Sequence, residues 1–469
     1  MATAEKPEDA AAALTALEAA RVERARLSEL GRWSEADEAA MNTLRDVLAI
    51  ASPDIVGPDL GGLVYVAGSP RPGPQTAGRN GHSVPAERLI ATCAMLLVNR
   101  GSDRQTAVEM VHKALKSFTW RDLGTFWYSM LTLAYADEGE TALHHLERAR
   151  TRAGWGESSA IVVLRARITA LGGRPEAAIR ICEDFLRSAV QDQFTEVAAA
   201  WTIDALVDLG ELDRAEVLVH DHGFQGDLAG VVDRAEVLAA RGALRQAAGR
   251  AEAAYHDFIA CGSEFAGWGV TNPAVIPWQS HAALCATASG RKTLAALLAE
   301  RELDQARRWG TPRAIGTALR ASAHVSAGEA GTAVLQEAVG LLARSGAHST
   351  LMRAQYELGV RLGLQEQHAA AMAAMLDSRE TARSTDHKPW ATRLDRAIGR
   401  CDAHPRTSTK LTPREREVVN LARSGLVNAE IADSLHLTES TIEYHLSNVY
   451  RKLGMSGRTD LRDIQIPVF

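Results

Sequence analysis

The sequence has few cysteines and no long apolar stretch. Its five cysteines, an odd number, lie far apart and form no CxxC pair. We therefore expect buried free thiols in a reducing compartment, not a disulfide framework. The longest apolar run, Ile90 to Val98, is too short to span a bilayer, and the N-terminus lacks the segments of a signal peptide. The sequence predicts a cytoplasmic protein without a membrane partner.

Motifs of catalysis and of nucleotide binding are also missing. Neither a GxSxG nucleophile elbow nor a GxxxxGK[ST] phosphate loop occurs. The nearest piece, Gly290 to Thr293, is interpreted as a repeat turn entering a helix. His144 and His145 are expected at the solvent face of a helix, and His220 to His222 form a polar turn. We expect no enzyme activity, no cofactor and no metal.

A strongly basic segment is absent as well. The net charge is −6. Residues 406–469 hold nine Lys and Arg against eight Asp and Glu, which leaves +1 there and −7 on the preceding 405 residues. Because affinity for DNA grows with the number of phosphates neutralised, one C-terminal segment should bind DNA weakly. This favours a dimer, or help from another protein.

What the sequence does contain is a periodic pattern of glycines. From Gly101 to Gly363 they recur every 34 to 41 residues. The turn positions are Gly31, Gly101, Gly139, Gly173, Gly210, Gly249, Gly290, Gly328 and Gly363. Five residues after the glycine stand Ala36, Ala178, Ala215, Ala254, Ala295 and Ala333. Six residues after it stand Ala107 and Ala369. Amphipathic helical stretches flank each glycine, which predicts helical hairpins that must stack to bury their apolar faces.

We therefore predict an all-α protein: a degenerate tetratricopeptide-like solenoid of roughly nine hairpins, followed by a small four-helix domain. The alternative is an irregular helical bundle with accidental glycine spacing. The expected segments are a first hairpin (1–51), a Gly/Pro-rich loop (52–85), further repeats (86–400), a linker (401–410) and a C-terminal domain (411–469).

The tryptophans are expected to pack between helices. Those in the repeats are Trp120, Trp127, Trp155, Trp201, Trp268, Trp278, Trp309 and Trp390. If several of them lined the concave face instead, they would suit a small apolar effector.

The C-terminal domain is rich in helix caps. Thr412, with Pro413 and Glu415 after it, predicts a capping box, and Gly425 predicts the end of that helix. Asn428 and Thr438 are expected to cap two more helices. The apolar positions of the third, at helical spacing, are Ile442, Leu446, Val449 and Leu453. A short helix, a turn and a longer helix predict a helix-turn-helix, and a last short helix is expected from Ser456.

Residues 411–464 resemble the LuxR-type helix-turn-helix. The residues that carry the resemblance are Leu411 to Glu415, Glu417, Gly425, Asn428, Glu430 to Ala432, Thr441, Ile442, His445, Asn448, Val449 and Lys452 to Gly454. The alternative is an ordinary hairpin closing a solenoid. Together with the repeats, the chain looks like the rear part of the large ATP-binding LuxR-family regulators, without their ATPase motif.

The resemblance implies a set of contacts to double-stranded DNA. Base readers would be Glu443, Tyr444 and Ser447; phosphate contacts would be Asn428, Thr438, Ser440, Thr441, Arg451 and Lys452; a homodimer contact would use Leu461 and Ile464. Many members have lysine at the position of Glu443. We expect Glu443 either to accept a hydrogen bond from a cytosine or to pair with a nearby arginine and read no base.

The function predicted is a transcriptional regulator. Its repeats would sense a small-molecule effector or bind a partner protein, and its C-terminal domain would bind promoter DNA. The alternative is a protein-interaction scaffold whose DNA-binding module is vestigial or depends on a partner.

Overall fold

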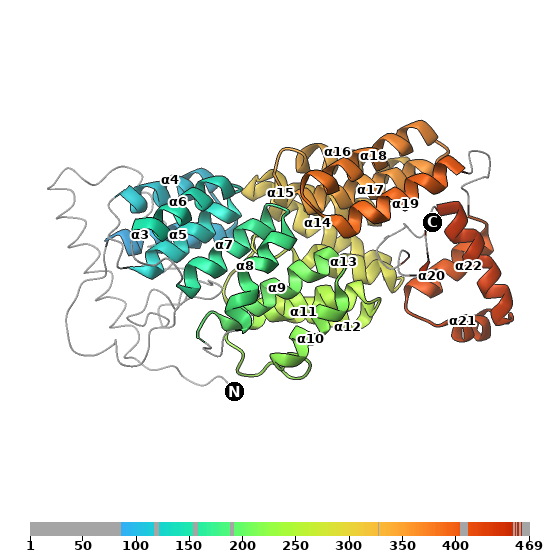
Figure 1. Ribbon diagram of the computed structural model, residues 1–469, viewed down its shortest axis with the longest axis horizontal. Coiled ribbons are helices and arrows are strands. Elements are labelled where there is room, and N and C mark those ends of the chain that lie inside the picture. Colours follow the sequence, from blue (N-terminus) through green and yellow to red (C-terminus); the bar gives the residue numbers. More distant parts are fainter. Residues whose placement is uncertain are drawn as a thin grey trace.

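The computed structural model describes residues 86–116, 122–152, 158–187, 192–326, 328–403 and 411–453, together with 455, 457, 458 and 461. Throughout these residues the regular structure is α-helix and no strand occurs, which confirms the all-α prediction (Figure 1). The predicted hairpin at 1–51 and the predicted loop at 52–85 lie outside the described residues.

The repeat helices are α3 (Ala86–Arg100), α4 (Arg104–Lys116), α5 (Leu123–Tyr135), α6 (Gly139–Arg152), α7 (Ser159–Leu171), α8 (Pro175–Arg187), α9 (Thr195–Leu209), α10 (Leu212–Asp221), α11 (Arg234–Ala247), α12 (Ala251–Gly267), α13 (Trp278–Ala288), α14 (Lys292–Trp309), α15 (Pro312–Val325), α16 (Gly328–Leu342), α17 (His348–Leu364), α18 (His368–Ser384) and α19 (Lys388–Ala403). The C-terminal helices are α20 (Pro413–Arg423), α21 (Asn428–Leu435) and α22 (Glu439–Leu453).

In the described repeats, eight consecutive helix pairs run from α3/α4 to α17/α18, and α19 follows alone. The two helices of a pair contact each other, and from α3 to α15 the first helix of each pair also contacts the first helix of the next. This is the neighbour pattern of stacked hairpins; their membership of the tetratricopeptide class stays a prediction. Helix α19 reaches Ala403, so the first three residues of the predicted linker 401–410 are helical.

Most predicted turn glycines lie where the backbone is left-handed. Between paired helices φ is +62° to +80° at Gly101, Gly173, Gly210, Gly249 and Gly290. Gly328 (φ +59°) is also left-handed but opens α16. The prediction is wrong at Gly139 and Gly363, which lie inside α6 and α17; Asp137 and Glu366 occupy the left-handed positions there. Aspartate adopts the left-handed conformation more readily than most residues, and the Asp137 carboxylate also binds Arg313.

The alanines that follow the glycines are buried at five positions: Ala107, Ala178, Ala215, Ala254 and Ala295. Ala333 and Ala369 are exposed instead. In the last pair the turn has moved to Glu366, and the buried alanine is accordingly Ala371, five residues after it. In the last pair the buried alanine thus follows the left-handed residue and not the glycine, whereas Ala333 is exposed although Gly328 is left-handed.

The stack winds back on itself, so that residues about 175 positions apart meet. Asn272 Nδ2 donates to the carbonyl of Val98 (2.7 Å), 174 residues away, and Trp309 Nε1 donates to the carbonyl of Tyr135 (2.8 Å), again 174 away. Figure 1 accordingly shows α14 and α15 beside the first pairs. The repeats thus form a superhelix whose successive turns contact each other. We call this arrangement a closed superhelix.

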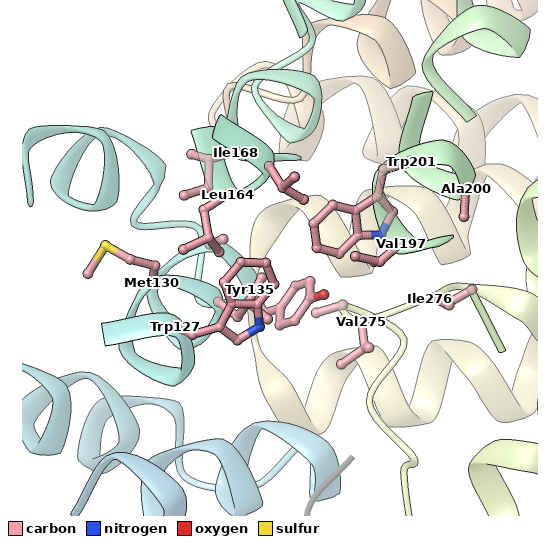
Figure 2. Packing of buried hydrophobic residues seen from close by; sticks show 14 of the residues in the cluster. Trp127, Met130, Tyr135, Leu164, Ile168, Val197, Ala200, Trp201, Val275 and Ile276 are labelled. Carbon is pink, nitrogen blue, oxygen red and sulfur yellow. The ribbon is translucent and has the colours of Figure 1, made fainter. Parts of the chain in front are cut away.

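Aromatic side chains fill the core between helices, as predicted (Figure 2). Trp127 stacks on Trp201 at 6.4 Å between ring centroids, and Trp309 and Trp390 are buried as well. Trp268 departs from the prediction, since 43% of it is exposed. Trp120 and Trp155 lie outside the described residues.

Candidate nucleic-acid interface

Helix α20 begins with the predicted capping box. Thr412 Oγ1 accepts from the backbone N–H of Glu415 (3.1 Å), and Glu415 Oε2 accepts from the backbone N–H of Thr412 (2.7 Å). At the other end of α20, Gly425 has φ +96°, as predicted for a helix end. Both ends of the helix therefore have their backbone groups satisfied by residues that the sequence pattern identifies.

Glu415 has a second partner that the sequence pattern did not indicate. Its carboxylate lies 2.6 Å from Lys452 Nζ in α22, and both side chains are largely buried. Burial raises the pKa of Glu415, but the bonds from Lys452 and from the N–H of Thr412 outweigh it, and the pKa is lowered. The pair ties the start of α20 to the end of α22.

The second helix starts one residue earlier than predicted. Val427 is its N-cap and its backbone N–H donates to Glu430 Oε2 (2.8 Å), while Asn428 is already helical. Asn428 is therefore not the N-cap, and the side chain of Val427, which is, makes no capping hydrogen bond. Asn428 Oδ1 instead accepts from Arg458 Nη1 (2.7 Å).

The turn between α21 and α22 is tight. His436 is the C-cap of α21 in the left-handed conformation (φ +53°), and Thr438 caps α22 as predicted, accepting from the N–H of Thr441 (3.3 Å). Arg414 Nη2 donates to the carbonyl of Leu435 (2.7 Å), which fixes this turn against α20. The turn therefore holds α21 and α22 in the relative positions of a helix-turn-helix.

Helix α22 has one buried and one exposed face. The predicted apolar stripe is buried, since Ile442 and Val449 are completely inaccessible and Leu446 and Leu453 nearly so. The opposite face presents the predicted base readers Glu443, Tyr444 and Ser447, all exposed; for Tyr444 the exposed fraction is 67%. Within the described part of the chain Glu443 forms no ion pair. The three side chains are thus presented together to solvent.

The predicted phosphate contacts are distributed around this face. Thr438, Ser440 and Arg451 are exposed and Thr441 is half-buried. Arg451 Nη2 donates to Asn448 Oδ1 (3.1 Å), one turn earlier on the same helix. Asn428 and Lys452 are half-buried and are bonded to Arg458 and Glu415, as described above.

The predicted dimer residues differ in what the structure says of them. Leu461 is fully buried and belongs to a core cluster with residues of α20, α21 and α22. Ile464 lies outside the described residues, as does Ser456, where the last helix was expected to start. In the structure, Leu461 itself is therefore a core residue.

The domain touches the repeats through the end of α20. A Cβ atom at Gly425 would lie 3.2 Å from the carbonyl oxygen of Gly249, in the turn between α11 and α12. Close by, Arg423 is buried, and burial lowers its pKa to about 10. The sequence carries no signal for this contact. It leaves α22 exposed on its polar face.

The described residues form neither a membrane span nor a metal site. No helix there is long and apolar enough to cross a bilayer, and no group of three or more His, Cys, Asp and Glu is placed to hold a metal ion. Four cysteines in that part of the chain are free and buried, as predicted: Cys93, Cys182, Cys261 and Cys285.

Comparison with known proteins finds likeness in the C-terminal domain. Residues 409–464 match the family described as "Bacterial regulatory proteins, luxR family". The transcriptional activator protein BjaR1 of Bradyrhizobium diazoefficiens is 51% identical over 55 residues, 12% of this chain and 23% of that protein. The transcriptional regulatory protein ComA of Bacillus subtilis is 44% identical over 50 residues, 11% and 23% of the two chains.

A longer relative shows the same limited overlap. The putative HTH-type transcriptional regulator Rv0890c of Mycobacterium tuberculosis is 47% identical over 53 residues, 11% of this chain but 6% of that protein. The chain thus matches a quarter or less of the length of these curated relatives. The C-terminal domain of this protein, residues 409–464, is a helix-turn-helix domain of the luxR family of bacterial regulatory proteins.

Proposed function

We propose that this protein is a transcriptional regulator that binds promoter DNA through α22 and receives its signal through the helical repeats. The observation that carries the proposal is the exposed face of α22. Three polar side chains project there, opposite a buried stripe, in a domain of a regulatory family. A recognition helix needs this arrangement, because one face must hold the fold while the other enters the major groove.

Within this proposal, Glu443, Tyr444 and Ser447 read bases. Glu443 can accept a hydrogen bond from the N4 amino group of cytosine, the exposed donor in the major groove that suits a carboxylate. In the alternative role, Glu443 would pair with an arginine and read no base. Among the described residues, Glu443 forms no such ion pair. Tyr444 can contact a thymine methyl group or donate its hydroxyl group to a phosphate.

Phosphate contacts would come from the ends of the two helices. Thr438, Ser440 and Thr441 surround the N-terminus of α22, where backbone N–H groups attract anions. Arg451 supplies a positive charge farther along. Lys452 and Asn428 are proposed with them, although each must share its contact with Glu415 or Arg458.

This supply of positive charge is small, and it supports a dimer. With Lys452 paired to Glu415 and Arg414 paired to Glu417, the domain presents few unpaired cations. Two domains on two half-sites, about one helical turn of DNA apart, would double the contacts. The dimer contact that we propose uses the C-terminal segment, through Leu461 and Ile464.

The test measures binding of the full chain to DNA fragments from its own genomic neighbourhood. Fluorescence anisotropy at several salt concentrations is the readout. Arg451→Ala should weaken binding to all sequences alike and lower the slope of log K against log salt by about one phosphate per domain. Arg344→Ala, which removes an equal charge at an exposed position in the repeats, is the matched control. Absence of specific binding by the wild type would favour the scaffold alternative.

A further inference from the structure

The closed superhelix contains a cavity of about 250 Å³. Its walls come from both turns of the superhelix: α7, α9 and α11 on one side, and α13, α15 and α17 on the other. Figure 2 shows one edge of this region, where Trp201 lies near Val275 and Ile276. The volume is smaller than the roughly 300–1000 Å³ of sites for drug-sized ligands. A small molecule would fill it.

The lining combines apolar walls with charged groups. Trp201 (4% exposed) and Phe258 (1% exposed) reach the lining, and alanines of α9 and α11 form more of it. Three of the four lining arginines are each held by a carboxylate: Arg313 by Asp137 (2.9 Å), Arg320 by Glu357 (2.6 Å) and Arg353 by Asp208 (2.9 Å). Their charges are therefore compensated within the protein.

Three carboxylates line the cavity, and that of Asp204 in α9 is more exposed than those of Asp208 and Glu236. The side chain of Asp204 is 54% exposed, whereas that of Arg167, its ion partner, is 7% exposed. The two are 3.5 Å apart, a long contact, and the Arg167 guanidinium also lies over the Trp201 ring at 5.0 Å. Asp204 is one of the residues that line the cavity. Desolvation there raises the pKa of Asp204.

Histidine adds a neutral acceptor to the same lining. His281 Nδ1 lies 2.9 Å from Gln246 Oε1, so the Nδ1–H tautomer donates there and leaves Nε2 as an acceptor. Desolvation, together with Arg320 and Arg353, lowers the pKa of His281 to about 3, which keeps the ring uncharged. The cavity thus offers a carboxylate and a neutral acceptor beside aromatic walls.

We propose that this cavity binds a small organic cation, an amine with a short apolar body, whose ammonium group pairs with Asp204. The ammonium would donate to the carboxylate, and the apolar body would lie against Trp201 and Phe258. An anion is disfavoured, because the lining arginines are already paired and less exposed than Asp204. The ligand's role as the effector rests on the proposed function; its binding does not.

The experiment is titration calorimetry on the full chain without DNA, with three probes of similar shape and different charge. These are phenethylamine (cation), phenethyl alcohol (neutral) and hydrocinnamate (anion). We expect the amine to bind at least about tenfold more tightly than either of the others, the effect of roughly one extra charge-assisted hydrogen bond. Omitting DNA keeps this result independent of whether α22 binds a promoter.

Two variants locate the binding. Asp204→Asn, which keeps the side-chain shape, should lower amine affinity about tenfold or more, and Asp213→Asn, an exposed change on α10, should leave it unchanged. Circular dichroism checks that both variants fold; if Asp204→Asn does not, the three-probe comparison on the wild type decides. Equal binding of the three probes, tighter binding of the anion, no binding of the amine, or an unaffected Asp204→Asn variant would overturn the proposal.

Discussion

The repeat region and the C-terminal domain use their charged residues in opposite ways. In the repeats, arginines and carboxylates are paired in the interior, as in Arg241–Asp257 and Arg320–Glu357, with side-chain exposures of 13% or less. In the C-terminal domain the polar residues of α22 face solvent, and a single largely buried pair, Lys452–Glu415, is seen among its described residues. In the repeats these charges are paired in the interior, whereas the polar face of α22 is exposed to solvent.

The largest test of this contrast is to break one interior pair. Glu357 binds Arg320 through two oxygens and His324 through one (3.0 Å). Glu357→Gln leaves Arg320 buried without a counter-charge, so the free energy of unfolding should fall by about 3–5 kcal/mol. Urea denaturation followed by tryptophan fluorescence reports on the repeats alone, because residues 411–469 contain no tryptophan. The exposed change Glu337→Gln is the control, expected within about 0.5 kcal/mol of the wild type.

The same pair sets a pH dependence. Burial raises the pKa of Glu357, but Arg320 and His324 outweigh burial and lower it to about 2, below the ordinary value of 4.5. A carboxyl group with a lowered pKa contributes stability above its unfolded pKa and loses it as pH falls. The repeats should therefore lose stability between pH 4.5 and about 2, and Glu357→Gln should flatten that loss. An unchanged acid profile in the variant would show that the pair is not its source.

A second test asks whether the superhelix is closed. Gly173 and Gly210 have similar backbone angles (φ +71° and +80°), but a Cβ at Gly173 would lie 2.6 Å from the backbone nitrogen of His348, whereas Gly210 has nothing within 4 Å. Alanine at either position should cost about 1–2 kcal/mol of backbone strain. Gly173→Ala should cost about 1–3 kcal/mol more, because the two superhelical turns must separate. Equal losses in unfolding experiments would mean that the turns do not meet at His348.

The C-terminal domain could be predicted from sequence in more detail than the repeats, because its determinants are local. The capping box joins residues three apart, and the stripe of α22 depends on helical spacing alone. The contacts that the sequence did not indicate join distant residues, such as Glu415 and Lys452, 37 positions apart. A sequence pattern carries no information on which distant charges will meet.

The repeats show the same limit more strongly. Glycine periodicity predicted the hairpins, yet nothing in it indicated that the stack closes after about 175 residues or that a cavity forms inside. Those features depend on single contacts such as Arg313–Asp137, 176 positions apart. The misplaced turns at Gly139 and Gly363 have a related cause: the pattern counted glycines, whereas the fold needs any residue that can be left-handed.

The smallest expected effect concerns the local determinants of the C-terminal domain. Thr412→Ala removes one acceptor of the capping box and should destabilise α20 by about 1 kcal/mol. Hydrogen exchange at the first amides of α20, including Glu415, should then become faster by roughly fivefold. Amides of repeat helices such as α9 should exchange at unchanged rates, because the capping box acts only within the C-terminal domain. Faster exchange in both regions would instead show that they unfold together.

The central claim, that the exposed face of α22 reads DNA, is tested most directly by selecting binding sites from random duplexes with three proteins: the wild type, Glu443→Ala and Arg451→Ala. We predict that Glu443→Ala changes the preference at one base pair by about 1–3 kcal/mol, the usual value of a base contact. Arg451→Ala should keep the wild-type preference and bind all sequences more weakly. Identical base preferences for the wild type and Glu443→Ala would contradict the assignment of Glu443 as a reader, and recovery of no preferred sequence by the wild type would contradict the claim as a whole.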